Sequence, residues 1–236
     1  MHTRTALIAL LGIDALLIAI FLGLHVADVR GAIETVPDLF KINARDGVPT
    51  LLLFLKWLLM SWVMARAARR TGARWAWGLA LMFFLLWFDD WAEVHEFFGD
   101  RMVEVFGLQP IAGLDADDIG EAVYILPFAA LCFGLVIWAM RAAGPGQRRD
   151  LVVLFVLLVV LGGFGVGVDL IAQAVRPLAS DATFDPRFVF LTIEDSGELV
   201  VGSLMLVRAA RIAHRLTAAA RSEPAGMGLG KPADPD

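Results

Sequence analysis

The chain has 236 residues, of which 58% are hydrophobic, and its mean hydropathy is +0.71. Soluble domains contain roughly 45–50% apolar residues, so this composition excludes an ordinary soluble protein. Twenty Lys and Arg against 25 Asp and Glu give a net charge of -5, which argues against a nucleic-acid partner. The single cysteine, Cys132, excludes an intrachain disulfide and a thiolate zinc cluster. We therefore expect a small polytopic membrane protein.

Apolar stretches of the length that spans a bilayer, about 20 residues, recur along the chain. We expect six transmembrane helices, at 6–27, 47–65, 75–98, 122–140, 151–175 and 188–207. The first is too long for a signal peptide and lacks a small-residue cleavage site, so we expect it to be retained. The predicted fold class is an all-α integral membrane bundle over residues 1–215. The Ala/Gly/Pro-rich segment 216–236 is expected to be a disordered tail.

The positive charges predict the orientation of these spans. Lys and Arg outside the spans number 13 on one side of the membrane and six on the other. The positive-inside rule then places both termini and the tail in the cytoplasm. Trp62, Trp75, Trp77 and Trp138 fall near the same boundary, as interfacial aromatic residues do. The sequence thus predicts a multi-pass protein of a bacterial inner membrane.

Acidic residues are unusually frequent inside the predicted spans. With a rise of 1.5 Å per residue, Asp89 lies about 22 Å from Arg74 and Glu194 about 21 Å from Arg208, so the two acids are level. Each ionised acid facing lipid near the membrane centre would cost about 2.5–3.5 kcal/mol. We therefore expect a shared polar cavity in the outer half of the membrane. The acids of the spans are Asp14, Asp89, Asp90, Glu93, Glu96, Asp169, Glu194, Asp195 and Glu198, with Glu121 at an edge.

Helical periodicity groups these acids. At 100° per residue Asp89, Glu93 and Glu96 form one narrow stripe, and Glu194 and Glu198 form an i,i+4 pair. Small residues allow helix backbones to approach closely, so a glycine run before Asp169 is expected to bring it beside its neighbours. That run is Gly162, Gly163, Gly165 and Gly167.

A pattern of two adjacent acids followed by a third, three residues on, occurs three times. It comprises Asp89, Asp90 and Glu93, then Asp117, Asp118 and Glu121, then Glu194, Asp195 and Glu198. For the middle copy, a solvated helix start is the simpler interpretation. The strings resemble the aspartate-rich diphosphate-binding motifs of membrane prenyltransferases over five residues only, and no function is carried over from them.

Carboxylates suit hard, oxygen-preferring cations. The predicted ligands of a divalent ion are Asp89, Glu93, Glu96, Glu194, Glu198, His25 and His95, and Mn, Fe, Zn, Ca and Mg are not distinguished. Asp169 and Asp195 are the predicted catalytic, proton-handling groups. At 100° per residue His95 projects about 120° away from the carboxylate stripe, so a packing role is the alternative for it. His25 is alternatively an interfacial polar residue, or a ring oriented by Asp28.

Lys56 is the one Lys or Arg within the spans, and two partners are open to it. It is level with Asp14 at about 15 Å from the cytoplasmic boundary, which favours a midplane ion pair. Glu198 lies at the same depth and is the alternative partner.

Three functions follow from these patterns. The first is a metal-dependent hydrolase or oxidoreductase that acts on a lipid-soluble substrate, with membrane lipid as its surroundings. The second is a proton- or divalent-cation-coupled transporter, because carboxylates inside membranes often line ion pathways. The third is a structural subunit of a membrane complex, in which buried charges give helix specificity. The last span contains no lysine, which argues against a retinal Schiff base.

Overall fold

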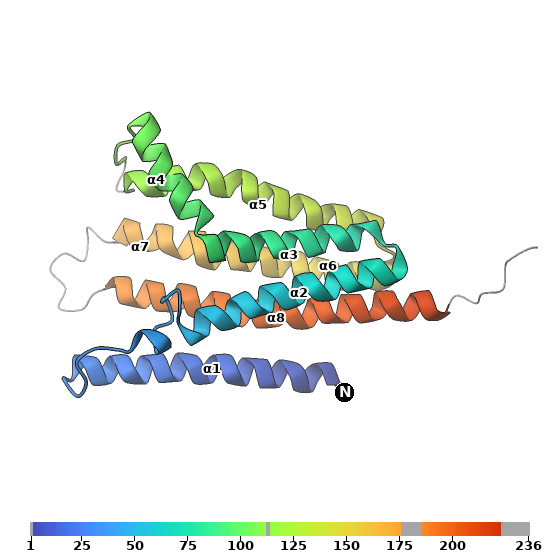
Figure 1. The fold of residues 1–236 in the computed structure, drawn as a ribbon, viewed down its shortest axis with the longest axis horizontal. Coiled ribbons are helices and arrows are strands. Elements are labelled where there is room, and N and C mark those ends of the chain that lie inside the picture. The colour runs from blue at the N-terminus through green and yellow to red at the C-terminus, as the bar shows by residue number, and fades with distance from the viewer. Residues whose placement is uncertain (1, 112–113, 176–185, 223–236) are drawn as a thin grey trace, which may run out of the picture.

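A computed structural model describes residues 2–111, 114–175 and 186–222 of the chain. Within these residues the fold is all-helical, and the only extended pairing is an isolated bridge between Ile111 and Leu114. The long helices lie side by side along one axis, and α4 crosses them at one end (Figure 1). The elements are α1 (His2–Val29), η1 (Asp38–Phe40), α2 (Val48–Thr71), α3 (Arg74–Ala92), α4 (Val94–Phe106), α5 (Ala116–Ala142), α6 (Pro145–Gly162), η2 (Gly163–Val168), α7 (Asp169–Val175) and α8 (Pro186–Ser222).

Four of these helical segments are long and apolar enough to cross a membrane, which indicates a membrane protein. They are Arg4–Val29, Val48–Thr71, Ala116–Ala142 and Pro145–Gln173, and they correspond to the first, second, fourth and fifth predicted spans. The third and sixth predicted spans form α3 and α8, which run alongside the others (Figure 1).

The core lies where α2, α3, α6 and α8 meet. Large side chains from all four helices are fully buried there, among them Trp57, Met60, Met64, Leu79, Phe83, Leu154 and Met205. In contrast, α1 is largely exposed on its outer face and packs mainly against α8. Apolar residues thus face both the core and the outside of the bundle, as expected of helices surrounded by lipid.

Local sequence explains where the helices begin and end. Proline lacks a backbone N–H and is tolerated in the first turn of a helix, where α2 contains Pro49 and α6 contains Pro145. α2 ends at Thr71 and is capped by Gly72, whose φ of 71° is the left-handed conformation that glycine adopts without steric cost. This turn reverses the chain into α3, so α2 and α3 pack along their length.

The structure corrects two of the predicted boundaries. The stretch 75–98 is not one helix, because α3 ends at Ala92 and a new helix, α4, begins at Val94. The helix at the C-terminal end continues to Ser222, so the first residues of the segment predicted as a disordered tail are helical. Residues 223–236 of that segment lie outside the described residues.

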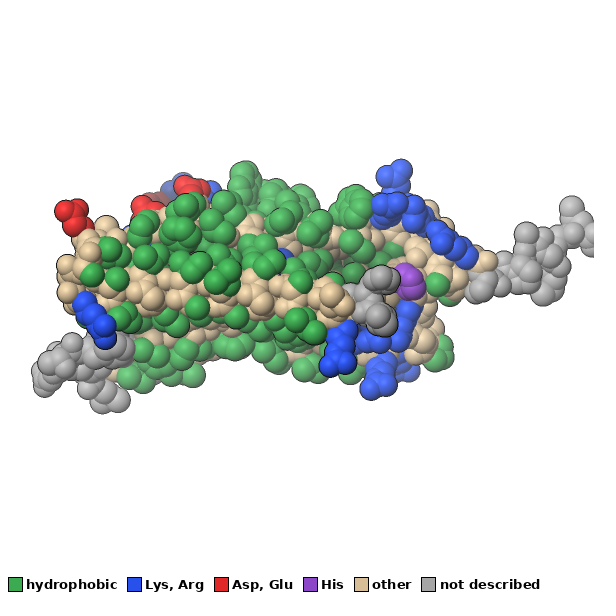
Figure 2. Space-filling model, turned by 90° about the horizontal axis from the view of Figure 1, so that it is seen from below, with side chains coloured by type: hydrophobic (Ala, Val, Ile, Leu, Met, Phe, Trp, Pro, Cys, Tyr) green, Lys and Arg blue, Asp and Glu red, His purple; other side chains and the backbone are tan. Residues whose placement is uncertain are grey.

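Charge is separated along the bundle. Twelve arginines lie where α1, α3 and α6 begin, where α2 and α5 end, and along the C-terminal part of α8. Figure 2 shows Lys and Arg side chains gathered at this end of the molecule. We call it the arginine end, and it consists of Arg4, Arg66, Arg69, Arg70, Arg74, Arg141, Arg148, Arg149, Arg208, Arg211, Arg215 and Arg221.

Candidate functional site

A cavity of about 720 Å³ lies toward the end of the bundle opposite the arginine end. It reaches the surface beside exposed residues of α4 and of the start of α5, such as Asp100 and Asp117. Two groups that can carry positive charge, Arg45 and His95, are among its lining residues. The acids that line it are Asp89, Asp90, Glu93, Glu96, Asp100, Asp117, Asp118, Glu121, Glu194, Asp195 and Glu198.

The cavity wall becomes apolar toward the middle of the bundle. On α5 the lining runs from Asp117 to Phe133, which is about 24 Å along the helix axis. The apolar lining includes Leu53, Phe54, Leu86, Ile125, Phe128, Phe133, Leu158 and Leu161. An acidic rim and an apolar interior in one cavity suit a ligand with a polar head and an apolar body, because each part finds a matching surface.

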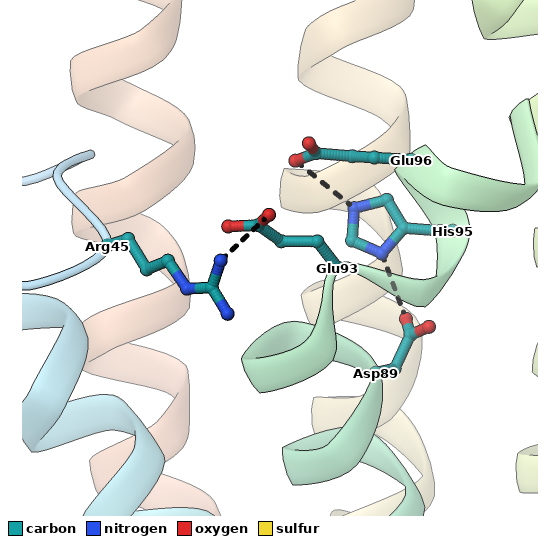
Figure 3. A network of polar contacts seen from close by, with 5 residues as sticks. All are labelled: Arg45, Asp89, Glu93, His95 and Glu96. Atoms are coloured by element: carbon teal, nitrogen blue, oxygen red, sulfur yellow. Dashed lines mark hydrogen bonds and ion pairs between the residues drawn. The ribbon is translucent and has the colours of Figure 1, made fainter. Parts of the chain in front are cut away.

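The junction between α3 and α4 shapes the rim. Glu93 has φ 50° and ψ 42°, and among the described residues it is the one non-glycine residue with positive φ. Arg45 holds this turn, since it donates to Glu93 Oε2 at 3.2 Å and to the carbonyl of Trp91 at 2.9 Å. Figure 3 shows Arg45 reaching Glu93 from the loop before α2. The break means that Asp89, Glu93 and Glu96 do not form the predicted stripe on one helix.

His95 turns toward the carboxylates, contrary to the direction expected from a continuous helix. Its Nδ1 lies 3.2 Å from Asp89 Oδ2 and its Nε2 lies 3.9 Å from Glu96 Oε1 (Figure 3). The hydrogen bond to Asp89 raises the pKa of His95 to about 9. A protonated ring has no lone pair for a metal ion, so in this state His95 neutralises the acids around it.

The acids of α8 face the interrupted helix α6–η2. A Cβ on Gly165 would come within 2.6 Å of Glu198 Oε1, so the absence of a side chain there makes room for this carboxylate. At the other three glycines of the predicted run, no neighbouring atom lies within 4 Å of the position that a Cβ would take. Gly165 is thus the one tight position of this run, and its neighbour there is a carboxylate side chain instead of the helix backbone that the sequence predicted. Within the part of the chain described, Asp195 Oδ2 and Asp89 Oδ1 are buried without a hydrogen-bond partner.

Lys56 is 1% exposed and contacts Leu199, a residue of the cavity wall. It donates to Asp14 Oδ1 and to the carbonyl of Leu199, each at 2.7 Å. Ser203 donates to the other Asp14 oxygen at 2.6 Å. The predicted pairing of Lys56 with Asp14 is thus confirmed, and the alternative partner Glu198 is not used. The network joins α1, α2 and α8 below the acidic rim.

The middle acidic string is a helix start. The side chains of Asp115 and Asp118 form a reciprocal capping box with each other's backbone N–H groups at the beginning of α5. The same turn packs tightly on α4, where a Cβ on Gly120 would lie 2.6 Å from the Gly99 carbonyl oxygen. The simpler interpretation of this string, a solvated helix start, therefore accounts for Asp118.

One predicted site residue, His25, is not brought to the cavity wall, and a second, Asp169, cannot be placed relative to it. His25 stacks on Phe188 with ring centroids 3.6 Å apart, between α1 and the start of α8, and is not among the lining residues. Asp169 begins α7, but its side chain lies outside what the structure describes.

Three residues that hydrogen-bond to the acids of the spans were not predicted from the sequence. Arg45 lies in a loop whose path no local pattern predicts. Trp57 donates its Nε1–H to Asp90 Oδ2 at 3.0 Å from a neighbouring helix. Ser203 could have been noticed, since it is a hydroxyl within an apolar run.

The acids are distributed around the cavity wall. Among the described residues, no group of three or more His, Cys, Asp or Glu side chains is placed to hold a metal ion directly. The arrangement can instead surround a cation that keeps part of its water shell, or the charged head of a larger ligand.

The fold and the cavity define a class: a helical membrane protein with an acid-lined cavity toward one end. The model of one family, the domain of unknown function DUF8692, matches residues 9–212. The chain belongs to this family. No curated protein and no solved structure matches the chain.

Proposed function

We propose that the chain crosses the membrane six times, with both termini in the cytoplasm. Besides the four apolar helices, α3 has 19 residues and so a length of about 28 Å, close to the thickness of the hydrocarbon core. The excess of Lys and Arg at one end of the bundle supports a cytoplasmic location for that end. The cavity then opens on the extracytoplasmic side of a bacterial inner membrane.

We further propose that the protein is a cation-dependent enzyme, a hydrolase or oxidoreductase, that acts on a lipid-soluble substrate in this cavity. The observation that carries the proposal is the joining of an acidic rim and an apolar interior in one cavity. The rim would attract a divalent cation such as Mg, Ca, Mn, Fe or Zn, and the interior would take an apolar chain. The cation would polarise the reacting bond of the substrate.

Individual acids have different roles in this proposal. Asp89, Glu93, Glu96, Glu194 and Glu198 would hold the hydrated cation. Asp195 is the favoured proton acceptor, because one of its oxygens is buried and accepts no hydrogen bond from the described residues. The spread of the acids around the wall supports a cation that keeps several water molecules, as Mg²⁺ commonly does.

Elemental analysis of the full chain, purified without chelator, tests the cation. The test variant is Glu93→Ala with Glu198→Ala. The control is Asp38→Ala with Glu104→Ala, which removes the same charge from two exposed ion pairs that contribute little to stability. We expect a near-stoichiometric cation in the parent and the control, but not in the test variant. Absence from all three, or equal content in all three, would refute the proposal.

Cation-coupled transport is a second candidate, and one observation favours it. The helix beside Glu198 is interrupted by the π-helical segment η2, and interrupted helices line ion sites in many transporters. The packed layer around Lys56 below the cavity favours a one-sided site instead. Uptake of a labelled divalent cation into proteoliposomes, abolished by Glu194→Gln, would establish transport. Uptake equal to that of empty liposomes would exclude it.

A further inference from the structure

The arginine end has far more positive charge than its own residues neutralise. Among the described residues the acid at this end is Asp150, which is 2% exposed. Asp150 accepts from Arg208 Nη1 and from Arg215 Nη1, each at 2.7 Å, so both of its oxygens are occupied. The other ten arginines are exposed, and none forms an ion pair with a carboxylate of the described residues.

The chemistry of this surface fits phosphate. All twelve basic groups at this end are arginines, although the chain also contains lysines elsewhere, such as Lys41 and Lys56. The guanidinium group donates two parallel hydrogen bonds to a phosphate and is more weakly hydrated than an ammonium group. Arginine is therefore the better partner for phosphate groups at a partly dehydrated surface.

The position of the arginines fits lipid. They come from α1, α2, α3, α5, α6 and α8, so they surround the bundle instead of covering one face. Figure 2 shows them on both edges of the same end. Exposed Trp62, Trp77 and Trp138 lie nearby along the same helices, and the guanidinium carbon of Arg66 lies 5.2 Å from the Trp62 ring centroid. Tryptophan concentrates where lipid headgroups meet hydrocarbon.

We propose that the arginine end binds the phosphate groups of anionic phospholipids in the leaflet that it contacts. A protein partner would cover one side of the bundle, whereas lipid surrounds all of it. Each basic residue near an anionic membrane surface contributes about a fivefold change in affinity. The inference does not depend on what the acidic cavity binds.

Native mass spectrometry of the full chain in detergent tests the proposal. Phosphatidylglycerol and phosphatidylcholine with identical acyl chains are supplied in equal amounts, and the bound molecules of each are counted. The test variant is R69Q/R70Q/R74Q, in which all three residues are exposed. The control is R30Q/K41Q/R101Q, which removes the same charge near the opposite end of the bundle.

We expect the parent and the control to prefer phosphatidylglycerol, and the test variant to lose that preference by about fivefold or more. Equal binding of the two lipids by the parent would overturn the proposal, as would an equal loss in both variants. If a variant does not fold, the lipid preference of the parent protein still tests the proposal. At 1 M salt the Debye length is about 3 Å, so the preference should disappear. A preference unchanged by salt would also overturn the proposal.

Discussion

Replacing Lys56 by Met tests the polar network beneath the cavity most directly. The two side chains have similar length, so the substitution leaves the packing nearly unchanged and removes the charge. Asp14, which is 0% exposed, would lose its bond to Lys56 and keep only the one from Ser203. The Leu199 carbonyl would lose the hydrogen bond from Lys56 as well. The expected result is a large loss of stability from an unpaired buried carboxyl group.

The size of this loss follows from the burial of both partners. Removing one member of a buried ion pair costs about 3–5 kcal/mol, because the remaining charge is left without compensation. For a chain of this size that corresponds to a fall in Tm of about 6–20 °C. Ser203→Ala removes one hydrogen bond to a charged group and should cost about 1.5–3 kcal/mol.

Reversible unfolding in mixed micelles, followed by circular dichroism, measures these differences. The matched control is the double variant Asp14→Leu with Lys56→Met, which removes both charges together. Replacing a buried pair by apolar residues is often neutral or stabilising, so the double variant should recover most of the lost stability. If Lys56→Met costs less than about 1 kcal/mol, or if the double variant is as unstable as the single one, the reasoning is wrong.

Three further predictions concern the rim of the cavity. Gly165→Ala should displace the Glu198 carboxylate and weaken cation binding measured by calorimetry, whereas Gly167→Ala, with open space around its Cβ, should not; equal effects would contradict this. Glu93→Gly should be more stable than Glu93→Ala by about 1 kcal/mol in chemical unfolding, because only glycine relaxes the positive φ; equal stabilities would show that the turn is unstrained. In ¹³C-histidine NMR of chelator-treated protein, His95 should titrate with a pKa of about 9. Since the pKa of free histidine is lower, about 6.5, the stabilisation from this group is complete below pH 6.5 and is lost as the pH rises through 9. Asp89→Asn should move this pKa down, and an unchanged value would refute the pairing.

The helices were predictable because a long apolar stretch inside a membrane must satisfy its own backbone hydrogen bonds, and the α-helix does this within one segment. The Asp14 and Lys56 pair was also predictable, since ionisable residues inside a membrane are costly unless paired, and these two opposite charges lie at the same depth. Depth along a helix is fixed by the rise per residue, so it can be calculated from the sequence alone.

The rim was less predictable, because it depends on a break in a helix. Nothing in the run from Phe88 to Phe98 requires a stop, as it contains neither proline nor glycine. The break occurs at Glu93, which adopts a left-handed conformation and is held by Arg45 from a distant loop. Tertiary contacts of this kind redirect every side chain that follows, which is why the expected direction of His95 was wrong.

The glycines were only partly predictable for a related reason. Small residues permit close approach, but they do not specify which partner approaches. The run at 162–167 contains one tight position, Gly165, where the neighbour is the Glu198 carboxylate and not another backbone. The backbone contact occurs instead between Gly99 and Gly120, at positions that the sequence did not single out.

The contact between Gly99 and Gly120 also limits how the cavity can open and close. The Gly99 backbone lies so near Gly120 that no side chain fits between them, and α4 is packed against α5 along this line. We therefore expect these two helices to move as one body. Any widening of the rim is then expected at the turn at Glu93, which Arg45 holds through two hydrogen bonds.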